Sequence, residues 1–405
     1  MTQPGQPAPQ PSYPNASQQA PNQQYQQQGS AYPGQQAPQQ QASQQMMGWP
    51  PQRQQEAPRA PQATNGATAA PQQVPVQRPE RLTNAELAEA RELLGGITRA
   101  YQRKVVGQDR LRESLLIALM TGGHILLESV PGLAKTTAAH ALAEAVDASF
   151  KRIQCTPDLL PSDIVGTQIY DATQNAFTTQ LGPVHANFVL LDEINRSSAK
   201  TQSAMLEAMQ EKQTTIGGTV YELPSPFLVM ATQNPIEQEG TYVLPEAQLD
   251  RFMLKDVLDY PTPVEEAEVL RRIDGGVFDE SSEAVASLDD VRRLQRLTKR
   301  VYLDASITEY LVGISYVTRH AGQYLPPELA RLVEVGASPR ASINFSKAAR
   351  ALALLNGRDH VIPDDIRRLS HRILRHRVIL GYEADAQGIT PEDIIDAMFQ
   401  AVRTP

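Results

Sequence analysis

Apolar and polar positions in the middle of the chain follow two different periods. Apolar residues recur at helical spacing in three segments: 108–120, 136–146 and 198–212. Between them lie four short strand-like runs, most of them continuously apolar: 124–127, 150–154, 188–191 and 227–232. Such runs separated by helices predict a parallel sheet covered on both faces, so we expect a three-layer α/β domain.

Strand-like runs end near residue 261, and helical periodicity takes over. Six helices are expected in this part: 264–274, 289–302, 306–320, 339–356, 363–376 and 391–402. At the other end of the folded part, Thr83 and Glu86 form a capping-box pattern that opens a helix. The pattern predicts an α/β domain over 81–262 and an all-helical domain over 263–405.

Residues 1–80 have the composition of a disordered tail. They hold 15 of the 31 prolines and 24 glutamines, but only Val74 and Val76 from the Leu/Ile/Val/Phe set. Such a segment buries too little apolar surface to offset its chain entropy. Four aromatic residues interrupt it, and they act either as weak stickers or as incidental members of a solvated linker: Tyr13, Tyr25, Tyr32 and Trp49.

Charge is unevenly distributed along the chain, whose formal net charge is −8. Residues 290–377 hold 16 Lys/Arg and 8 Asp/Glu, whereas the rest of the folded part carries a net −17. We expect the basic segment to face an acidic surface of a neighbouring copy. The acidic balance makes nucleic acid an improbable partner.

Other features of the composition exclude several classes of protein. Cys155 is the single cysteine, which rules out an intramolecular disulfide and a thiolate zinc cluster. The sequence shows no signal peptide and no stretch near 18 apolar residues. We therefore expect a cytoplasmic protein without membrane insertion.

A candidate phosphate-binding loop follows the first strand and opens a helix. Backbone N–H groups of such a loop face phosphates, Lys135 reaches their oxygens, and the Thr136 hydroxyl ligates Mg²⁺. The loop has Ser129 and Ala134 where the G-x-x-x-x-G-K-[ST] pattern has glycine. Taken alone, it could equally be a structural turn.

Two acids close the buried run at 188–191. Asp192 is placed to hold Mg²⁺, and Glu193 to activate the attacking water. Acids at strand ends are also common simply because such ends are solvated. The order and spacing of the loop and the acids favour a nucleotide hydrolase.

Five stretches, which include the loop and the two acids, make the chain resemble the MoxR branch of the AAA+ ATPases: 126–136, 192–196, 231–242, 244–252 and 336–341. The resemblance covers about residues 81–405 and omits the tail. It implies a Mg²⁺-dependent ATPase that forms a six-membered homo-oligomeric ring. It also implies client proteins, among them proteins with von Willebrand factor A domains or metalloenzymes awaiting maturation.

The resemblance assigns roles to individual residues. Asn234 matches sensor 1, Arg251 the arginine finger and Arg340 sensor 2. Their structural alternatives are a capping Asn before Pro235, a surface ion pair of Arg251 with Asp250 or Glu246, and a helix-start arginine. The expected nucleotide-binding residues are Val106, Gly107, Ser129, Val130, Pro131, Gly132, Leu133, Ala134, Lys135, Thr136 and Thr137.

Two insertions resemble hairpins that face the ring surface or pore in this family. The first, at 163–184, contains two strand-like pieces, and the second, at 214–223, contains a Gly217-Gly218 turn. Both could also be plain surface hairpins. Most relatives carry glycine at the Ser129 position, so serine would weaken ATP binding if its backbone were left-handed and would cost little if extended.

Three functions therefore compete. The first is an ATP-driven chaperone-like remodeller, and the second is a nucleotide-gated scaffold with little turnover. The third, a nucleic-acid motor, is kept open only by the basic segment.

Overall fold

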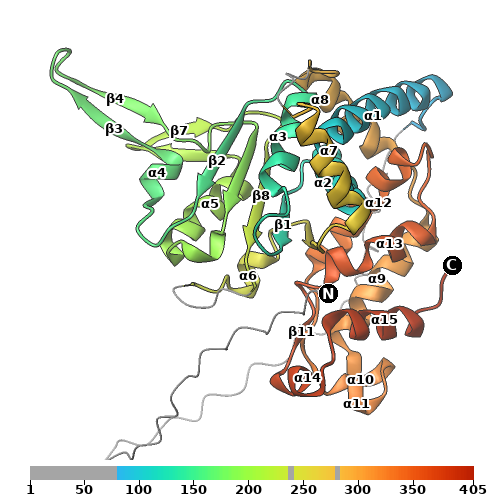
Figure 1. Ribbon diagram of the computed structural model, residues 1–405. Helices are drawn as coiled ribbons and strands as arrows, with labels where there is room; N and C mark the ends of the chain where they lie inside the picture. The colour runs from blue at the N-terminus through green and yellow to red at the C-terminus, as the bar shows by residue number, and fades with distance from the viewer. Residues whose placement is uncertain (1–79, 236–240, 279–282) are drawn as a thin grey trace, which may run out of the picture. The chain divides into compact units, whose positions relative to one another are not determined.

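The computed structural model describes residues 80–235, 241–278 and 283–405 (Figure 1). The predicted tail, except residue 80, and positions 236–240 of one family stretch therefore lie outside the described residues. The described part opens with helix α1 (Asn84–Lys104). Its capping box is confirmed, because the Thr83 hydroxyl accepts from the Glu86 N–H while the Glu86 carboxylate accepts from the Thr83 N–H at 2.9 Å.

The predicted parallel sheet is confirmed. Its strands run in the order β2-β5-β8-β1-β9, and every neighbouring pair is parallel. Their bounds are β1 (Ile125–Glu128), β2 (Phe150–Gln154), β5 (Phe188–Asp192), β8 (Leu228–Gln233) and β9 (Leu254–Val257). β9 was not predicted, because Lys255 and the fully buried Asp256 interrupt its apolar pattern.

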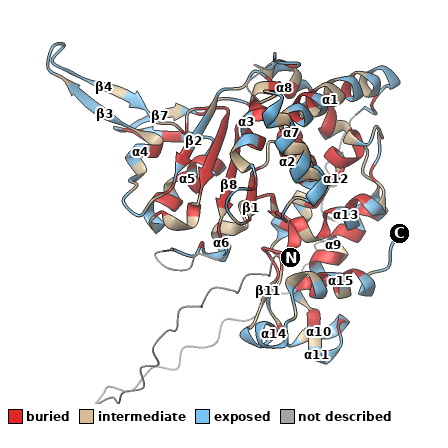
Figure 2. Ribbon diagram, in the orientation of Figure 1, coloured by how far each residue is buried: buried red, intermediate tan, exposed pale blue. Residues whose placement is uncertain are grey.

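Alternate residues of the central strands β1, β5 and β8 enter two separate cores, one on each face of the sheet. Ile125 and Leu127 pack with α1, α2 (Asp109–Thr121) and α3 (Lys135–Ala145). Leu126 joins the opposite core, which includes α5 (Ala199–Glu211). This period of two is what a strand buried on both faces requires, and β5 and β8 are accordingly buried along their length (Figure 2).

Both predicted hairpins form. β3 (Gly166–Asp171) pairs with β4 (Ala176–Leu181), after the short helix α4 (Pro161–Val165), and β6 (Gln213–Ile216) pairs with β7 (Thr219–Glu222). Figure 1 shows the β3–β4 hairpin projecting beyond the sheet. Four of its large apolar side chains are exposed: Ile169, Tyr170, Phe177 and Leu181.

The six helices expected after residue 263 are present, but this part is not wholly helical. β10 (Val333–Val335) and β11 (Ile379–Leu380) form a small antiparallel pair that corrects the prediction. Runs of two or three residues are too short to show a strand period. The helices are α7 (Pro263–Asp274), α8 (Leu288–Arg300), α9 (Ala305–Arg319), α10 (Ala321–Tyr324), α11 (Pro327–Ala330), α12 (Pro339–Leu355), α13 (Pro363–Leu374), α14 (Tyr382–Gln387) and α15 (Pro391–Ala401).

Within the described part of the chain, no helix is long and apolar enough to cross a membrane.

Candidate functional site

The candidate phosphate loop lies at the edge of the sheet where the parallel strands end, which we call the carboxyl edge. It runs from β1 to the start of α3 at Lys135. The Ser129 N–H donates to the Gln233 carbonyl at 3.1 Å, so the loop is anchored to the end of β8. The Lys135 ammonium donates to the Val130 carbonyl at 3.4 Å and therefore curls back over the loop.

Backbone strain in the loop falls at Ala134 rather than at Ser129. Ala134 has φ +53°, and Gly132 has φ +85°, whereas Ser129 is not among the described residues with positive φ. Ser129 therefore does not carry the conformational free-energy cost that a left-handed serine would have. Its side chain is buried, and its Oγ lacks a hydrogen-bond partner among the described residues.

Asp192 is the last residue of β5 at the same edge, and Glu193 follows it. One Asp192 oxygen accepts from the Thr232 hydroxyl at 2.7 Å, and the Glu193 N–H donates to that same hydroxyl at 2.8 Å. Glu193 itself is left-handed, with φ +58° and ψ +52°. Thr232 thus orients both acids, and the strained backbone of Glu193 is typical of a functional position.

Two side chains from β2, which sequence reasoning missed, hold these carboxylates. Arg152 donates to Asp192 through two nitrogens, at 2.6 and 3.1 Å. Gln154 donates to Glu193 at 3.1 Å. These contacts follow from the register of β2 with β5, which places Gln154 beside Asp192. The sequence alone does not show that register.

Other predicted residues gather at this edge. Asn234 follows β8 and is buried, with an exposed fraction of 6%. Burial lowers the pKa of Lys135, although the nearby Asp192 and Glu193 oppose that shift. An approaching triphosphate would favour the charged ammonium in the same way as those acids.

A mostly apolar cavity of about 560 Å³, which we call the base cavity, adjoins the loop. Val106 and Thr137 line it, as do Val269 and Ile273 of α7. α7 has no buried residue, and its main ties to α1 are Arg272 bonds to the Gln102 and Arg103 carbonyls at 2.7 and 3.1 Å. An apolar lining beside the loop is what a nucleotide base would require if its phosphates were bound on the loop.

Gly107 lies beside the base cavity in a tight turn with φ +63°. A Cβ at this position would lie 2.1 Å from the Glu265 carboxylate, so the Glu265 side chain would have to move to admit a larger residue.

The chemistry of the oxygen donors fits Mg²⁺. Thr136 follows the loop lysine, and Asp192 and Glu193 supply carboxylates across from it. The described residues contain no cluster of three or more His, Cys, Asp or Glu side chains that could hold a metal by itself. Mg²⁺ is commonly bound by one or two protein oxygens together with substrate phosphates, which is the arrangement available here.

Arg251 lies at the opposite edge of the sheet, which we call the amino edge. Two residues after it, the Met253 N–H donates to the His124 carbonyl just before β1. β1 has four residues, so about 13 Å of strand separates this edge from the phosphate loop. The predicted alternative of an ion pair with Asp250 or Glu246 is wrong, since no such pair occurs among the described residues, and the buried Arg251 Nε lacks a partner there.

Arg340 lies with Arg251, not with the phosphate loop. Its guanidinium is 3.5 Å from the Asp250 carboxylate, which also accepts from the capping Ser338 hydroxyl at 2.8 Å. The predicted helix start at Ser338 and Pro339 is confirmed. The candidate site residues thus form two groups, one at each edge.

Arg377 binds the segment that carries Arg251. It is a buried residue that the sequence reasoning did not single out. It donates to the Asp250 carboxylate at 2.7 Å and to the Phe252 carbonyl at 2.6 Å. It also donates to the Asp250 carbonyl at 3.1 Å. Burial lowers the pKa of Arg377, and Asp250 opposes the shift. The contacts on both sides of Arg251 fix the backbone from which that side chain extends.

Comparison with known proteins agrees with this architecture. A sequence model of the ATPase family associated with various cellular activities (AAA) matches residues 124–254, and an AAA lid domain model matches residues 329–398. Chaperone MoxR1 of Mycobacterium tuberculosis is 48% identical over 75% of this chain and 80% of its own length. Protein MoxR of Methylorubrum extorquens is 31% identical over 80% of this chain and 98% of its own length.

A solved structure supports the same assignment. The crystal structure of a protein from Cytophaga hutchinsonii, named as a candidate ATPase, superposes with a TM-score of 0.75 at 46% identity. It covers 79% of this chain and 97% of its own. With the phosphate loop, the paired acids and these relatives in agreement, the chain belongs to the MoxR family of AAA+ ATPases.

Proposed function

We propose that the chain hydrolyses ATP at sites shared between neighbouring copies of a homo-oligomeric ring and uses the cycle to remodel client proteins. One observation carries the proposal. The phosphate loop and acids lie at the carboxyl edge, whereas Arg251 and Arg340 lie at the amino edge of the same sheet. One chain therefore offers two halves of a phosphoryl-transfer site that cannot meet within it.

At the carboxyl edge each residue has a distinct task. Backbone N–H groups at the start of α3 face the phosphates, and Lys135 supplies a positive charge. Mg²⁺, held by Thr136 and Asp192, would neutralise charge on the phosphate oxygens. Glu193 accepts a proton from the attacking water, and buried Asn234 orients that water.

At the amino edge the two arginines would act on the nucleotide of a second copy. A guanidinium that enters a neighbour's site stabilises the charge that spreads over the transferred phosphoryl group. The Arg377 contacts hold the Arg251 backbone ready for this, and Asp250 lies between Arg340 and Arg377. We expect assembly to weaken with salt, because the basic segment 290–377 would face an acidic surface of the adjacent copy.

The exposed β3–β4 hairpin supports action on proteins. The Tyr170 and Phe177 rings make an edge-to-face contact with centroids 5.4 Å apart, and both side chains are about half exposed or more. Exposed aromatic residues are common in protein contact surfaces. Proteins with von Willebrand factor A domains are the first clients to test, since the family resemblance implies them.

A complementation experiment tests the shared site. Lys135→Ala removes the loop cation, and Arg251→Ala removes the donated arginine. Each variant alone should hydrolyse ATP slowly. Mixing them should restore a substantial fraction of the wild-type rate, because some boundaries combine an intact loop with an intact Arg251. Activity in the mixture that equals the mean of the two variants would refute the shared site.

The scaffold alternative has one observation in its favour, since Arg152 and Gln154 already occupy Asp192 and Glu193. Steady-state ATPase of the wild type and of Glu193→Gln separates the two functions. A wild-type rate no higher than that of Glu193→Gln would identify a scaffold.

A further inference from the structure

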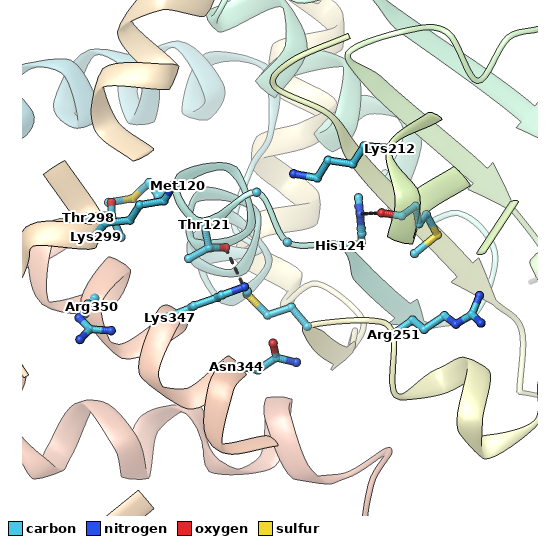
Figure 3. A pocket seen from close by; sticks show the side chains of 14 residues that line it. Met120, Thr121, His124, Lys212, Arg251, Thr298, Lys299, Asn344, Lys347 and Arg350 are labelled. Carbon is cyan, nitrogen blue, oxygen red and sulfur yellow. Dashed lines mark hydrogen bonds between the residues drawn. The ribbon is translucent and has the colours of Figure 1, made fainter. Parts of the chain in front are cut away.

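A second cavity lies at the amino edge, bounded by the ends of α2 and α8 and by α12. It has a volume of about 370 Å³. Lys212, Lys299 and Lys347 line it from three different elements, and we call it the lysine pocket. In Figure 3 the ammonium groups of these three lysines are directed toward the space around Thr121.

The lysine pocket is strongly cationic. Arg251 and Arg350 also line it, and none of its lining residues is acidic. The three lysines form no ion pair or hydrogen bond with any described residue, whereas Arg350 is bonded to the Val301 carbonyl at 3.0 Å and the Ser346 hydroxyl at 2.7 Å. His124 adds no charge near neutral pH, because burial lowers its pKa to about 4.

The negative ends of two helix dipoles offset part of this positive charge. α2 ends at Gly122, close to the Lys212 ammonium, and Lys299 belongs to the last turn of α8. Each helix end contributes roughly half a negative charge. Two such ends offset about one of the positive charges, and Lys347, in the middle of α12, has no such partner.

The lysine pocket lies apart from the phosphate loop and borders the group of candidate residues at the amino edge. β1 lies between it and the phosphate loop, with His124 at one end and Ser129 at the other. Arg251 belongs to its rim, but its guanidinium is directed away from the three ammonium groups in Figure 3. Lys347 lies seven residues after Arg340 and Asn344 four residues after it, so α12 carries all three on one face.

We infer that the lysine pocket binds an oligophosphate anion. Three ammonium groups from separate elements match a ligand with three or more negative charges, and lysine binds phosphate as a point charge. Concave clusters of one sign also concentrate counter-ions. The Asn344 amide provides a neutral donor in the same space. The ligand is either a free oligophosphate or the phosphate chain of a nucleotide held by a second copy.

Calorimetric titration with inorganic tripolyphosphate tests the inference. The full-length Lys135→Ala variant is used, so that the phosphate loop contributes little. We expect saturable binding that weakens tenfold or more when Lys347→Glu or Lys299→Glu is added. Lys151→Glu, an equal charge reversal at an exposed position of β2, serves as the matched control and should leave binding unchanged.

The source of the phosphate is separated by protein concentration. Binding to dilute, monomeric protein that Lys347→Glu abolishes supports a free oligophosphate. Absence of such binding, combined with a tenfold loss of ATP-dependent association by Lys347→Glu in the otherwise native chain, supports the nucleotide of a second copy. The absence of both effects would overturn the inference. Equal loss of association with and without ATP would also overturn it, because the lysines would then contact an acidic protein surface. These outcomes do not depend on whether the chain hydrolyses ATP.

Discussion

The two edges of the central sheet differ in the sign of their charged side chains and in how many of these side chains have partners within the chain. At the carboxyl edge, carboxylates and a lysine lie close together, and Arg152, Gln154 and Thr232 orient the acids. At the amino edge, cations predominate, and the Arg251 side chain lacks an internal partner among the described residues. On the function proposed above, the first edge would bind the chain's own nucleotide, whereas the second would present its arginines to a neighbouring copy.

At the amino edge, contacts within the chain fix the position of the backbone that carries Arg251. The Arg251 side chain, which has no partner among the described residues, extends from a backbone that Arg377 binds on both sides. Preorganisation of this kind removes the entropic cost of ordering a donated residue at the moment of reaction. The position of the Arg251 backbone is thus fixed, while its guanidinium can still contact a group outside the chain.

The largest expected effect comes from removing the donated guanidinium. Arg251→Ala should lower kcat about 10³-fold, because an arginine finger typically contributes 10³–10⁵ in rate. ATP affinity, measured with a fluorescent analogue, should stay within about threefold, since the phosphate loop is intact. A parallel loss of affinity would place Arg251 on its own nucleotide and remove the distinction between the edges.

A smaller effect is expected when the Arg377 contacts that hold the Arg251 backbone are weakened. Arg377→Lys keeps the charge but loses most of the five-donor geometry, so kcat should fall about 10- to 100-fold as the finger shifts. ATP affinity should not change, and addition of Lys135→Ala subunits, which carry an intact Arg251 segment, should restore activity. Failure of that rescue, with a folded variant by circular dichroism, would show that Arg377 has only a general structural role.

Two buried histidines at the amino edge predict acid sensitivity. Burial lowers the pKa of His124 to about 4 and that of His376 well below its usual 6.5. The unfolded chain therefore binds more protons below pH 6.5, and stability falls as pH drops from there toward the folded pKa. Each histidine should cost at most about 1.4 kcal/mol per pH unit.

Thermal unfolding between pH 7 and 5 measures this effect. His124→Gln should flatten the dependence, whereas the exposed His140→Gln should leave it nearly unchanged. Equal slopes for both variants would contradict the assignment to the buried group.

The smallest effect concerns Ser129 and Ala134, the two loop positions where the G-x-x-x-x-G-K-[ST] pattern has glycine. Ala134→Gly should stabilise the chain by about 1 kcal/mol, because it relieves a left-handed alanine. Ser129→Gly should give no such gain, since Ser129 is not left-handed. Chemical denaturation of both variants checks the difference, and a larger gain from Ser129→Gly would reverse our view of where the loop is strained.

Local patterns predicted much of the fold. Short strand-like runs, most of them continuously apolar, predicted four strands of the sheet, and the Thr83 and Ser338 caps marked helix starts correctly. The pattern missed β9 because its central Asp256 is charged, yet this carboxylate is fully buried near Arg110 and Arg372. A strand stabilised by ion pairs from distant helices leaves no local hydrophobic signal.

The candidate site was predicted less completely. Lys135, Asp192 and Glu193 follow recognisable strand ends, so their order along the chain was informative. Arg152 and Arg377 reach their partners across 40 and 127 residues, through strand register and helix packing. Such long-range contacts depend on the assembled fold, and single-sequence patterns do not contain them.

The α7 helix has a consequence for how nucleotide exchange would proceed. Val269 and Ile273 line the base cavity, but no residue of this helix is buried. A purine in the cavity would act as the missing core of the helix, so ligand binding and local folding of α7 become one equilibrium. Amide hydrogens of α7 should then exchange slowly only while nucleotide is bound. In that sense, the ligand's residence time would be set by how often this helix opens.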